Sequence, residues 1–157
     1  VGLPRAAPAP GHLVICLPDA RVAFAGDLLI EDGVAVVVDG SSGGLLAALN
    51  RLEALKPLQV MPGHGRLSSN PIEIIHLSRC ETLALRAKMR DDVARNISMS
   101  KALAQLPPAD RDRPVSRNSR VRRNAVRMFA EMEQELLHSS AESTAQKDSV
   151  AMVSCPH

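Results

Sequence analysis

Two short β-prone runs, with a leucine-rich stretch of helical periodicity between them, most constrain the fold of this 157-residue chain. The first run covers residues 21–25 and the second covers residues 58–61. Between the runs, Leu45, Leu49 and Leu52 recur at the spacing of one helix face, behind Ser41 and Ser42, either of which can cap the helix. The order strand, helix, strand predicts a βαβ crossover.

A hairpin is predicted just before this crossover. Residues 13–17 form another β-prone run, and the turn that follows, Pro18-Asp19-Ala20, contains a proline that fixes φ and an aspartate that caps a turn. The run over residues 21–25 then returns as the second strand of the hairpin. The β-branched run over residues 34–38, bounded by Asp-Gly pairs, predicts a further strand or extended edge segment.

From residue 71 onward the pattern becomes helical, and helices are predicted over residues 71–95, 98–105 and 120–137. The apolar face expected on the first comprises Ile72, Ile75, Cys80, Leu83, Ala87 and Val93. The face expected on the last comprises Val121, Ala125, Met128, Phe129, Met132 and Leu136. We expect three parts: residues 1–70 as the α/β body, residues 71–137 as a helical extension packed on it, and residues 138–157 as a flexible tail without periodicity.

The composition limits the classes of ligand. With two phenylalanines and no tyrosine or tryptophan, the chain has almost no aromatic surface for stacking on bases or sugars. Lysine and arginine number 19 against 17 acidic residues, so no global field steers the chain towards nucleic acid or anionic lipid. A basic cluster does occur late in the chain, at Arg117, Arg120, Arg122, Arg123 and Arg127. Because three glutamates follow it, we interpret the cluster as a solvated helix face and expect no nucleic-acid partner.

The cysteines are odd in number and widely spaced, at Cys16, Cys80 and Cys155. This spacing argues against a disulfide framework and favours a reducing compartment, so a cytoplasmic location is expected. No run approaches the ~20 apolar residues that span a bilayer, and no membrane partner is expected. His76 falls within a predicted amphipathic helix and is expected at the surface.

Asp27 and His64 are the candidate metal ligands. Asp27 follows the second β-prone run in the segment Ala25-Gly26-Asp27-Leu28, and His64 follows a later run in Pro62-Gly63-His64-Gly65. A carboxylate and an imidazole, each presented after a strand by glycine-permitted backbone, are suited to an open hydrolytic metal site. The chain lacks a His-x-His, His-Glu-x-x-His or Cys-x-x-Cys pair, so a complete site is not encoded.

The order of these segments resembles a known family. Residues 11–29, the block Asp39-Gly40-Ser41, the leucine-rich helix and residues 60–65 together resemble the C-terminal half of metallo-β-lactamase-fold hydrolases, over roughly residues 6–66. The resemblance implies an α/β fold: half of an αββα sandwich, a mixed sheet with covering helices, here with a helical C-terminal extension. Residues 123–133 further resemble the branch of quinoprotein-relay-type zinc metallohydrolases.

The resemblance also implies a site. Asp27 would bridge two Zn²⁺ ions and His64 would bind the second ion, while a shared hydroxide attacks an ester, thioester, amide or phosphate centre of a small-molecule substrate. The family's His-x-His-x-Asp-His block lies N-terminal to every matched residue and has no counterpart here. A further ligand histidine falls on Pro8, with His12 four residues later as the substitute.

Two hypotheses remain open. In the first, the chain is the C-terminal portion of a zinc-dependent hydrolase and is inactive alone because its metal site is incomplete. In the second, it is a degenerate, non-catalytic module of the same fold that works through interactions. Half of a sandwich leaves one sheet face uncovered, so we expect association through that face, with a second copy or with a missing segment.

Overall fold

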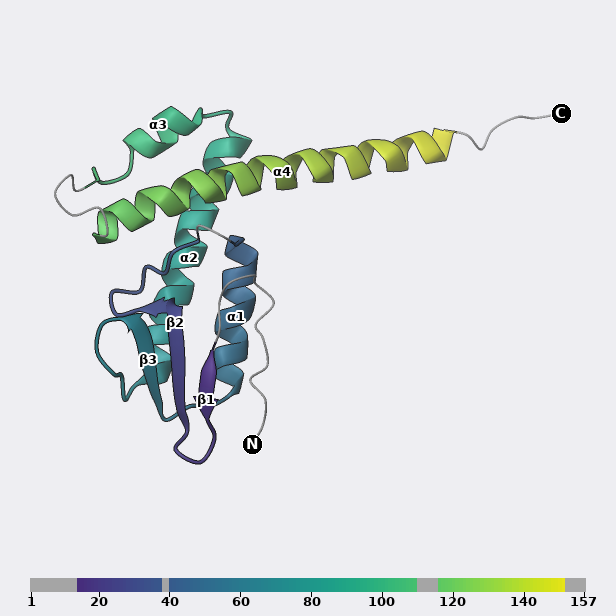
Figure 1. Cartoon of the computed structure of the whole chain (residues 1–157). Helices are drawn as coiled ribbons and strands as arrows, with labels where there is room; N and C mark the ends of the chain where they lie inside the picture. Colours follow the sequence, from purple (N-terminus) through teal and green to yellow (C-terminus); the bar gives the residue numbers. More distant parts are fainter. Residues whose placement is uncertain (1–13, 38–39, 110–115, 152–157) are drawn as a thin grey trace.

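The computed structural model describes residues 14–37, 40–109 and 116–151, with side chains up to residue 138. Three strands and four helices follow one another along the chain: β1 (Ile15–Leu17), β2 (Val22–Ile30), α1 (Ser42–Ala54), β3 (Gln59–His64), α2 (Pro71–Ala94), α3 (Met99–Ala104) and α4 (Arg117–Ala151). α1 and α2 run alongside the small sheet, and α4 lies across the upper part of α2 in Figure 1. The α/β architecture with a helical extension is thereby confirmed.

The sheet has the strand order β1-β2-β3. β1 pairs with β2 in antiparallel orientation through a turn in which the Arg21 amide donates to the Pro18 carbonyl at 3.2 Å, so the predicted hairpin is confirmed. β2 pairs with β3 in parallel orientation, with α1 between them in the chain. The predicted βαβ crossover is therefore also confirmed.

The two faces of the sheet differ in cover. Ala23 and Val60 point into one core with residues of α1 and α2 and are 1% and 0% exposed. On the opposite face, Ile15, Leu17 and Phe24 are 40–47% exposed, and Ile15 lies directly across from Phe24. Because side chains alternate along a strand, the helices cover one face and leave an apolar row on the other. Among the described residues, this row is the kind of apolar surface that half of a sandwich would leave exposed.

α1 forms as its sequence predicts. Ser41 is the N-cap, and its hydroxyl accepts a hydrogen bond from the Gly44 amide at 2.9 Å. Leu45, Leu49 and Leu52 are all buried. The cap satisfies an otherwise unpaired amide, and the leucine stripe fixes the helix against the sheet.

Residues 34–37 do not form the predicted strand, and residue 38 lies outside the described residues. The segment is buried, with Val34, Ala35 and Val37 at most 4% exposed, but no strand in the described part of the chain pairs with it. Side chains of α4 bind its backbone instead. The β-branched run predicted a strand or an extended edge segment, and the strand is wrong because the backbone partners of residues 34–37 come from α4, a helix far along the chain.

The predicted apolar face of α2 is wrong at most of its positions. Ile72 and Leu83 are 68% and 47% exposed, and Cys80 and Ala87 are also exposed. The buried face instead contains Pro71, Ile74, Ile75, Ser78, Thr82, Met89 and Asp92. α2 packs against α1, β2 and α4 at once, and small polar side chains allow the close approach: the Ser78 hydroxyl, for example, donates to the Gly33 carbonyl at 3.1 Å.

α4 is longer than predicted. Ala125, Met128, Phe129 and Met132 are buried as expected, but the helix runs on from the predicted end near Leu137 to Ala151. Residues 138–151 contain no glycine or proline, the two residues that most disfavour a helix, so the helix can continue where apolar periodicity ends. The division into three parts stays a prediction. Among the described helices, none combines the length and apolar character needed to cross a bilayer.

Candidate metal centre

The structure brings Asp27 and His64 together. His64 Nε2 lies 3.4 Å from Asp27 Oδ1, and the two side chains are 73% and 59% exposed. Asp27 comes from β2 and His64 is the last residue of the adjacent parallel strand β3. Parallel pairing thus places a carboxylate and an imidazole at the same end of the sheet, open to solvent.

An irregularity in β2 presents Asp27. Gly26 lies opposite Pro62 and Ile30 lies opposite His64, so β2 uses more residues than β3 between the same two pairings. Gly26 has φ of 52°, which glycine adopts without strain. The extra residues bulge, and bulges redirect side chains. The sequence placed Asp27 at the end of the strand; the structure places it inside a longer strand, within the bulge.

Gly63 permits the close approach of the two strands. A Cβ on Gly63 would lie 2.4 Å from Asp27 Oδ1, 2.7 Å from the carbonyl carbon of Gly26 and 2.8 Å from the Asp27 amide nitrogen. Two of these atoms belong to the backbone and cannot move aside as a side chain does. A residue with a side chain at position 63 would therefore displace Asp27 from His64.

The loop after β3 is tied to the end of β2. The Glu31 amide donates to the His64 carbonyl at 3.0 Å, and Arg66 Nε donates to Glu31 Oε1 at 3.0 Å. Gly65, with φ of 122°, lies against the Glu31 side chain. An open cavity of about 510 Å³ begins at Glu31 and Arg66 and extends to the start of α2. These contacts hold the backbone at His64 and leave concave space next to it.

The donor set fits part of a zinc centre. Carboxylate oxygen and imidazole nitrogen are both zinc ligands, and both side chains are accessible to an ion from solvent. Within residues 14–37, 40–109 and 116–138, however, no three His, Cys, Asp or Glu side chains lie close enough to hold a metal. Pro8 and His12, which bear on a further ligand, lie outside the described residues. The described residues therefore offer two candidate ligands, Asp27 and His64.

Sequence reasoning missed a ladder of polar contacts from α4 to the segment that follows β2. Arg120 Nε donates to the Val34 carbonyl at 3.0 Å and its guanidinium also pairs with Asp32. Asn124 receives a hydrogen bond from the Val37 amide at 2.9 Å and donates one to the Ala35 carbonyl at 2.7 Å.

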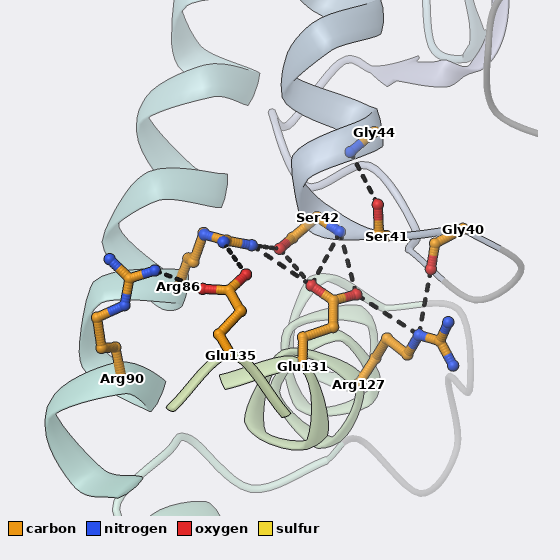
Figure 2. A network of polar contacts seen from close by, with 9 residues as sticks. All are labelled: Gly40, Ser41, Ser42, Gly44, Arg86, Arg90, Arg127, Glu131 and Glu135. Carbon is orange, nitrogen blue, oxygen red and sulfur yellow. Dashed lines mark hydrogen bonds and ion pairs between the residues drawn. The ribbon is translucent and has the colours of Figure 1, made fainter. Parts of the chain in front are cut away.

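The ladder continues one and two turns further along α4. Arg127 Nε donates to the Gly40 carbonyl at 3.1 Å, and both carboxylate oxygens of Glu131 accept from the Ser42 amide at 3.1 Å (Figure 2). The rungs at residues 120, 124, 127 and 131 have the spacing of one helix face. From residue 120 to residue 131 of α4, the side chains bind successive residues of the segment that leads from β2 into α1, from residue 34 to residue 42.

Figure 2 also shows how α2 joins this network. Arg86 contacts the Ser42 hydroxyl and pairs with Glu135, and Arg90 pairs with Glu135 at 2.6 Å. Burial acts to raise the pKa of the Glu135 carboxyl, but the hydrogen bonds and charges of Arg90 and Arg86 outweigh it, so the pKa is lowered. Burial raises the pKa of the Cys16 thiol, in keeping with a packed cysteine.

The interpretation of the arginine cluster as a solvated face is therefore wrong for two of its members. Arg120 is 9% exposed, and Arg122 Nη1 donates to the Leu103 carbonyl at 2.8 Å. The sequence did contain a signal for these contacts: the polar residues at positions 120, 124, 127 and 131 recur with the same helical period as the apolar residues of α4. The partners of these rungs lie nearly ninety residues away and have no local signature.

Comparison with known proteins finds one matching family, over the N-terminal part of the chain. The family model of the metallo-beta-lactamase superfamily matches residues 3–64, a span that contains Asp27 and ends at His64. The match covers less than half of the chain, and α2, α3 and α4 lie beyond it. No curated protein matches the chain. Residues 3–64 of this chain are thus similar to the metallo-beta-lactamase superfamily.

Proposed function

We propose that this chain supplies Asp27 and His64 to the zinc centre of a metallo-β-lactamase-like hydrolase, as the C-terminal portion of that enzyme. The observation that carries the proposal is the 3.4 Å approach of His64 Nε2 to Asp27 Oδ1. The bulge at Gly26 and the lack of a side chain at Gly63 both serve this approach. The family match over the same two strands supports it.

The two residues have different roles. The Asp27 carboxylate would hold zinc through its oxygens, of which it has two, and the His64 imidazole would hold zinc through one ring nitrogen. Bound zinc supplies a hydroxide at neutral pH, because it lowers the pKa of its water to ~7. The remaining ligands come from residues other than those described, and the substrate is a small molecule with an ester, thioester, amide or phosphate group.

We propose that the segment with the remaining ligands packs on the exposed apolar face of the sheet. Ile15, Leu17 and Phe24 form an apolar surface on the side of the sheet away from α1 and α2. Covering such a surface is favourable, because each Å² of apolar area removed from water contributes about 25 cal/mol. Without that segment, we propose that copies of the chain associate through the same face.

The second candidate function is a non-catalytic interaction module. It is favoured by the lack of a third ligand near Asp27 and His64 among the described residues and by Pro8 at the expected histidine position. It predicts the same fold and the same open face, but no gain of hydrolysis. A cytoplasmic location, which the unpaired cysteines favour, fits either candidate.

Complementation distinguishes the two candidates. The chain is mixed with, or fused behind, an N-terminal half of a metallo-β-lactamase-fold hydrolase that carries the His-x-His-x-Asp-His block, in the presence of Zn²⁺. The enzyme proposal predicts hydrolysis of an ester or thioester panel that Asp27→Asn and His64→Gln abolish. Glu133→Gln, which changes an exposed carboxylate on α4, is the matched control and keeps the activity. A complex that forms and stays inactive supports the interaction module.

A further inference from the structure

The outer face of α2 carries an exposed stripe that the proposed function does not use. Ile72, His76, Cys80, Leu83 and Ala87 follow one another at intervals of three or four residues, the spacing of one helix face. Ile72 is 68% exposed and Leu83 is 47% exposed, and the other three are exposed as well. The opposite face of α2 is the one that packs against the rest of the molecule. An apolar stripe of this kind on a helix is an expected contact surface.

A thiol and an imidazole lie in the middle of this stripe. Cys80 Sγ is 3.3 Å from His76 Nε2, one helical turn apart on α2. With Zn–S of about 2.3 Å and Zn–N of about 2.0–2.1 Å, two ligands of a tetrahedral zinc ion lie about 3.5 Å apart. The pair therefore already has nearly the spacing that a single ion requires. Two ligands four residues apart on a helix are also a known zinc-binding arrangement.

One chain does not complete a site here. In the described part of the chain, no group of three His, Cys, Asp or Glu side chains lies close enough to hold a metal. A structural zinc ion takes four ligands, and a twofold axis doubles every ligand that one copy supplies. Two copies of the His76 and Cys80 pair provide the Cys₂His₂ set of structural zinc sites.

The stripe suits such a twofold arrangement. The His76 and Cys80 pair lies near the middle of the stripe, between Ile72 at one end and Ala87 at the other. When two α2 helices pack antiparallel, the two pairs meet and Ile72 of one copy lies near Leu83 and Ala87 of the other. The uncovered sheet face lies on the other side of the sheet from α2, so it stays free in this arrangement.

We propose that His76 and Cys80 form a zinc clip, and that a second copy of this chain completes the site through the outer face of α2. On binding, each Cys80 thiol releases its proton to solvent and its sulfur bonds to the ion, while each His76 binds through a neutral ring nitrogen. No electron transfer is involved. The site is separate from Asp27 and His64, so it does not depend on the proposed hydrolase function.

Metal titration of the full chain tests the proposal. Co²⁺ is added as a spectroscopic substitute for Zn²⁺, and a thiolate-to-cobalt charge-transfer band is expected to saturate at about half an equivalent per chain. In sedimentation experiments, Zn²⁺ is expected to double the mass of the sedimenting species, and a chelator to reverse the change. Association through the sheet face does not need metal, so it is the same with and without chelator. The difference in mass between the two samples therefore reports only the metal-dependent association.

The variants assign the site. Cys80→Ser and His76→Gln are expected to lose the metal-dependent doubling, and Cys80→Ser is expected to lose the charge-transfer band. Cys16→Ser, Cys155→Ser and Asp27→Asn are matched controls that keep both signals. A metal-dependent dimer that persists in Cys80→Ser, or a chain whose mass does not change with Zn²⁺, overturns the proposal.

Discussion

Gly63 of β3 leaves the space in which Asp27 of β2 lies. A side chain on Gly63 would reach to within 2.4 Å of the Asp27 carboxylate and 2.8 Å of its amide nitrogen. Because Gly63 has no side chain, the bulge of β2 at Gly26 and Asp27 can lie directly against β3. The position of the Asp27 carboxylate therefore depends on the backbone of β3 at Gly63.

Gly63→Ala is expected to destabilise the fold and to separate the two ligands. The added methyl group meets backbone atoms, which yield less readily than side chains, so we expect a loss of about 1–3 kcal/mol in the free energy of unfolding. Chemical denaturation measures it. Gly43→Ala is the matched control: nothing lies within 4 Å of a Cβ at that position in α1, and alanine there is expected to be neutral or to stabilise by up to about 1 kcal/mol. Equal effects of the two substitutions would contradict this account.

Asn124 is expected to be the most sensitive rung of the α4 ladder. The Asn124 side chain is the hydrogen-bond partner of two buried backbone groups, the Val37 amide and the Ala35 carbonyl. Asn124→Ala leaves both groups unsatisfied, and each unsatisfied group costs about 1–3 kcal/mol. We therefore expect a loss of several kcal/mol in urea unfolding, or failure to fold. Asn50→Ala, on the exposed side of α1, is expected to stay within about 0.5 kcal/mol of the unchanged protein. A loss at Asn124 no larger than that at Asn50 would show that α4 does not hold residues 34–37.

The pKa of Glu135 predicts a dependence of stability on pH. Its folded pKa is lowered below 4.5, because the contacts with Arg90 and Arg86 outweigh burial. The stabilisation is thus present above pH 4.5 and is lost as pH falls through the folded pKa. Because 43% of the side chain is exposed, solvent screening limits the effect to at most about 1 kcal/mol.

Urea midpoints measured against pH for the unchanged protein and Glu135→Gln test this dependence. The two curves are expected to differ near neutral pH and to converge below pH 4.5. Glu133→Gln, on an exposed position of the same helix, is the control and is expected to leave the curve unchanged. Curves that stay parallel into acid would mean that the contacts of Arg86 and Arg90 do not favour the charged form.

The uncovered sheet face is expected to drive association. Phe24→Ser removes the largest side chain of the apolar row and is expected to lower both self-association and the binding of an apolar dye. Leu137→Ser changes a more exposed leucine, 70% accessible on α4, and should leave both unchanged. Light scattering and dye fluorescence measure the two effects. A chain that is monomeric and does not bind the dye before any substitution contradicts the expectation.

Local patterns sufficed for the elements whose partners are close in sequence. The hairpin, α1 with its Ser41 cap and the crossover to β3 depend on turns, caps and a leucine stripe within some fifty residues, and all are found in the structure. The position of Asp27 was predicted only roughly, since a bulge depends on the register between two strands.

The features that the sequence did not predict depend on contacts between segments far apart in the chain. The buried face of α2 contains Ser78 and Thr82 and excludes Ile72, because three elements pack on it and small side chains admit them. Residues 34–38 were predicted as a strand or extended edge segment because they are β-branched, but Asn124 of α4 binds the backbone of the described residues 35 and 37 in place of a neighbouring strand. Sequence periodicity identifies an amphipathic pattern but not which surface the neighbours cover.

Zinc binding at Asp27 and His64 tests the central claim most directly. Calorimetric titration with Zn²⁺ is carried out in the Cys80→Ser background, which removes the thiol of the proposed clip on α2. The account predicts that Asp27→Asn and His64→Gln each weaken binding by at least about tenfold, since each removes one ligand, and that Glu133→Gln, at an exposed position of α4, leaves the affinity unchanged. Equal zinc affinity in all four proteins would contradict the assignment of Asp27 and His64 as metal ligands.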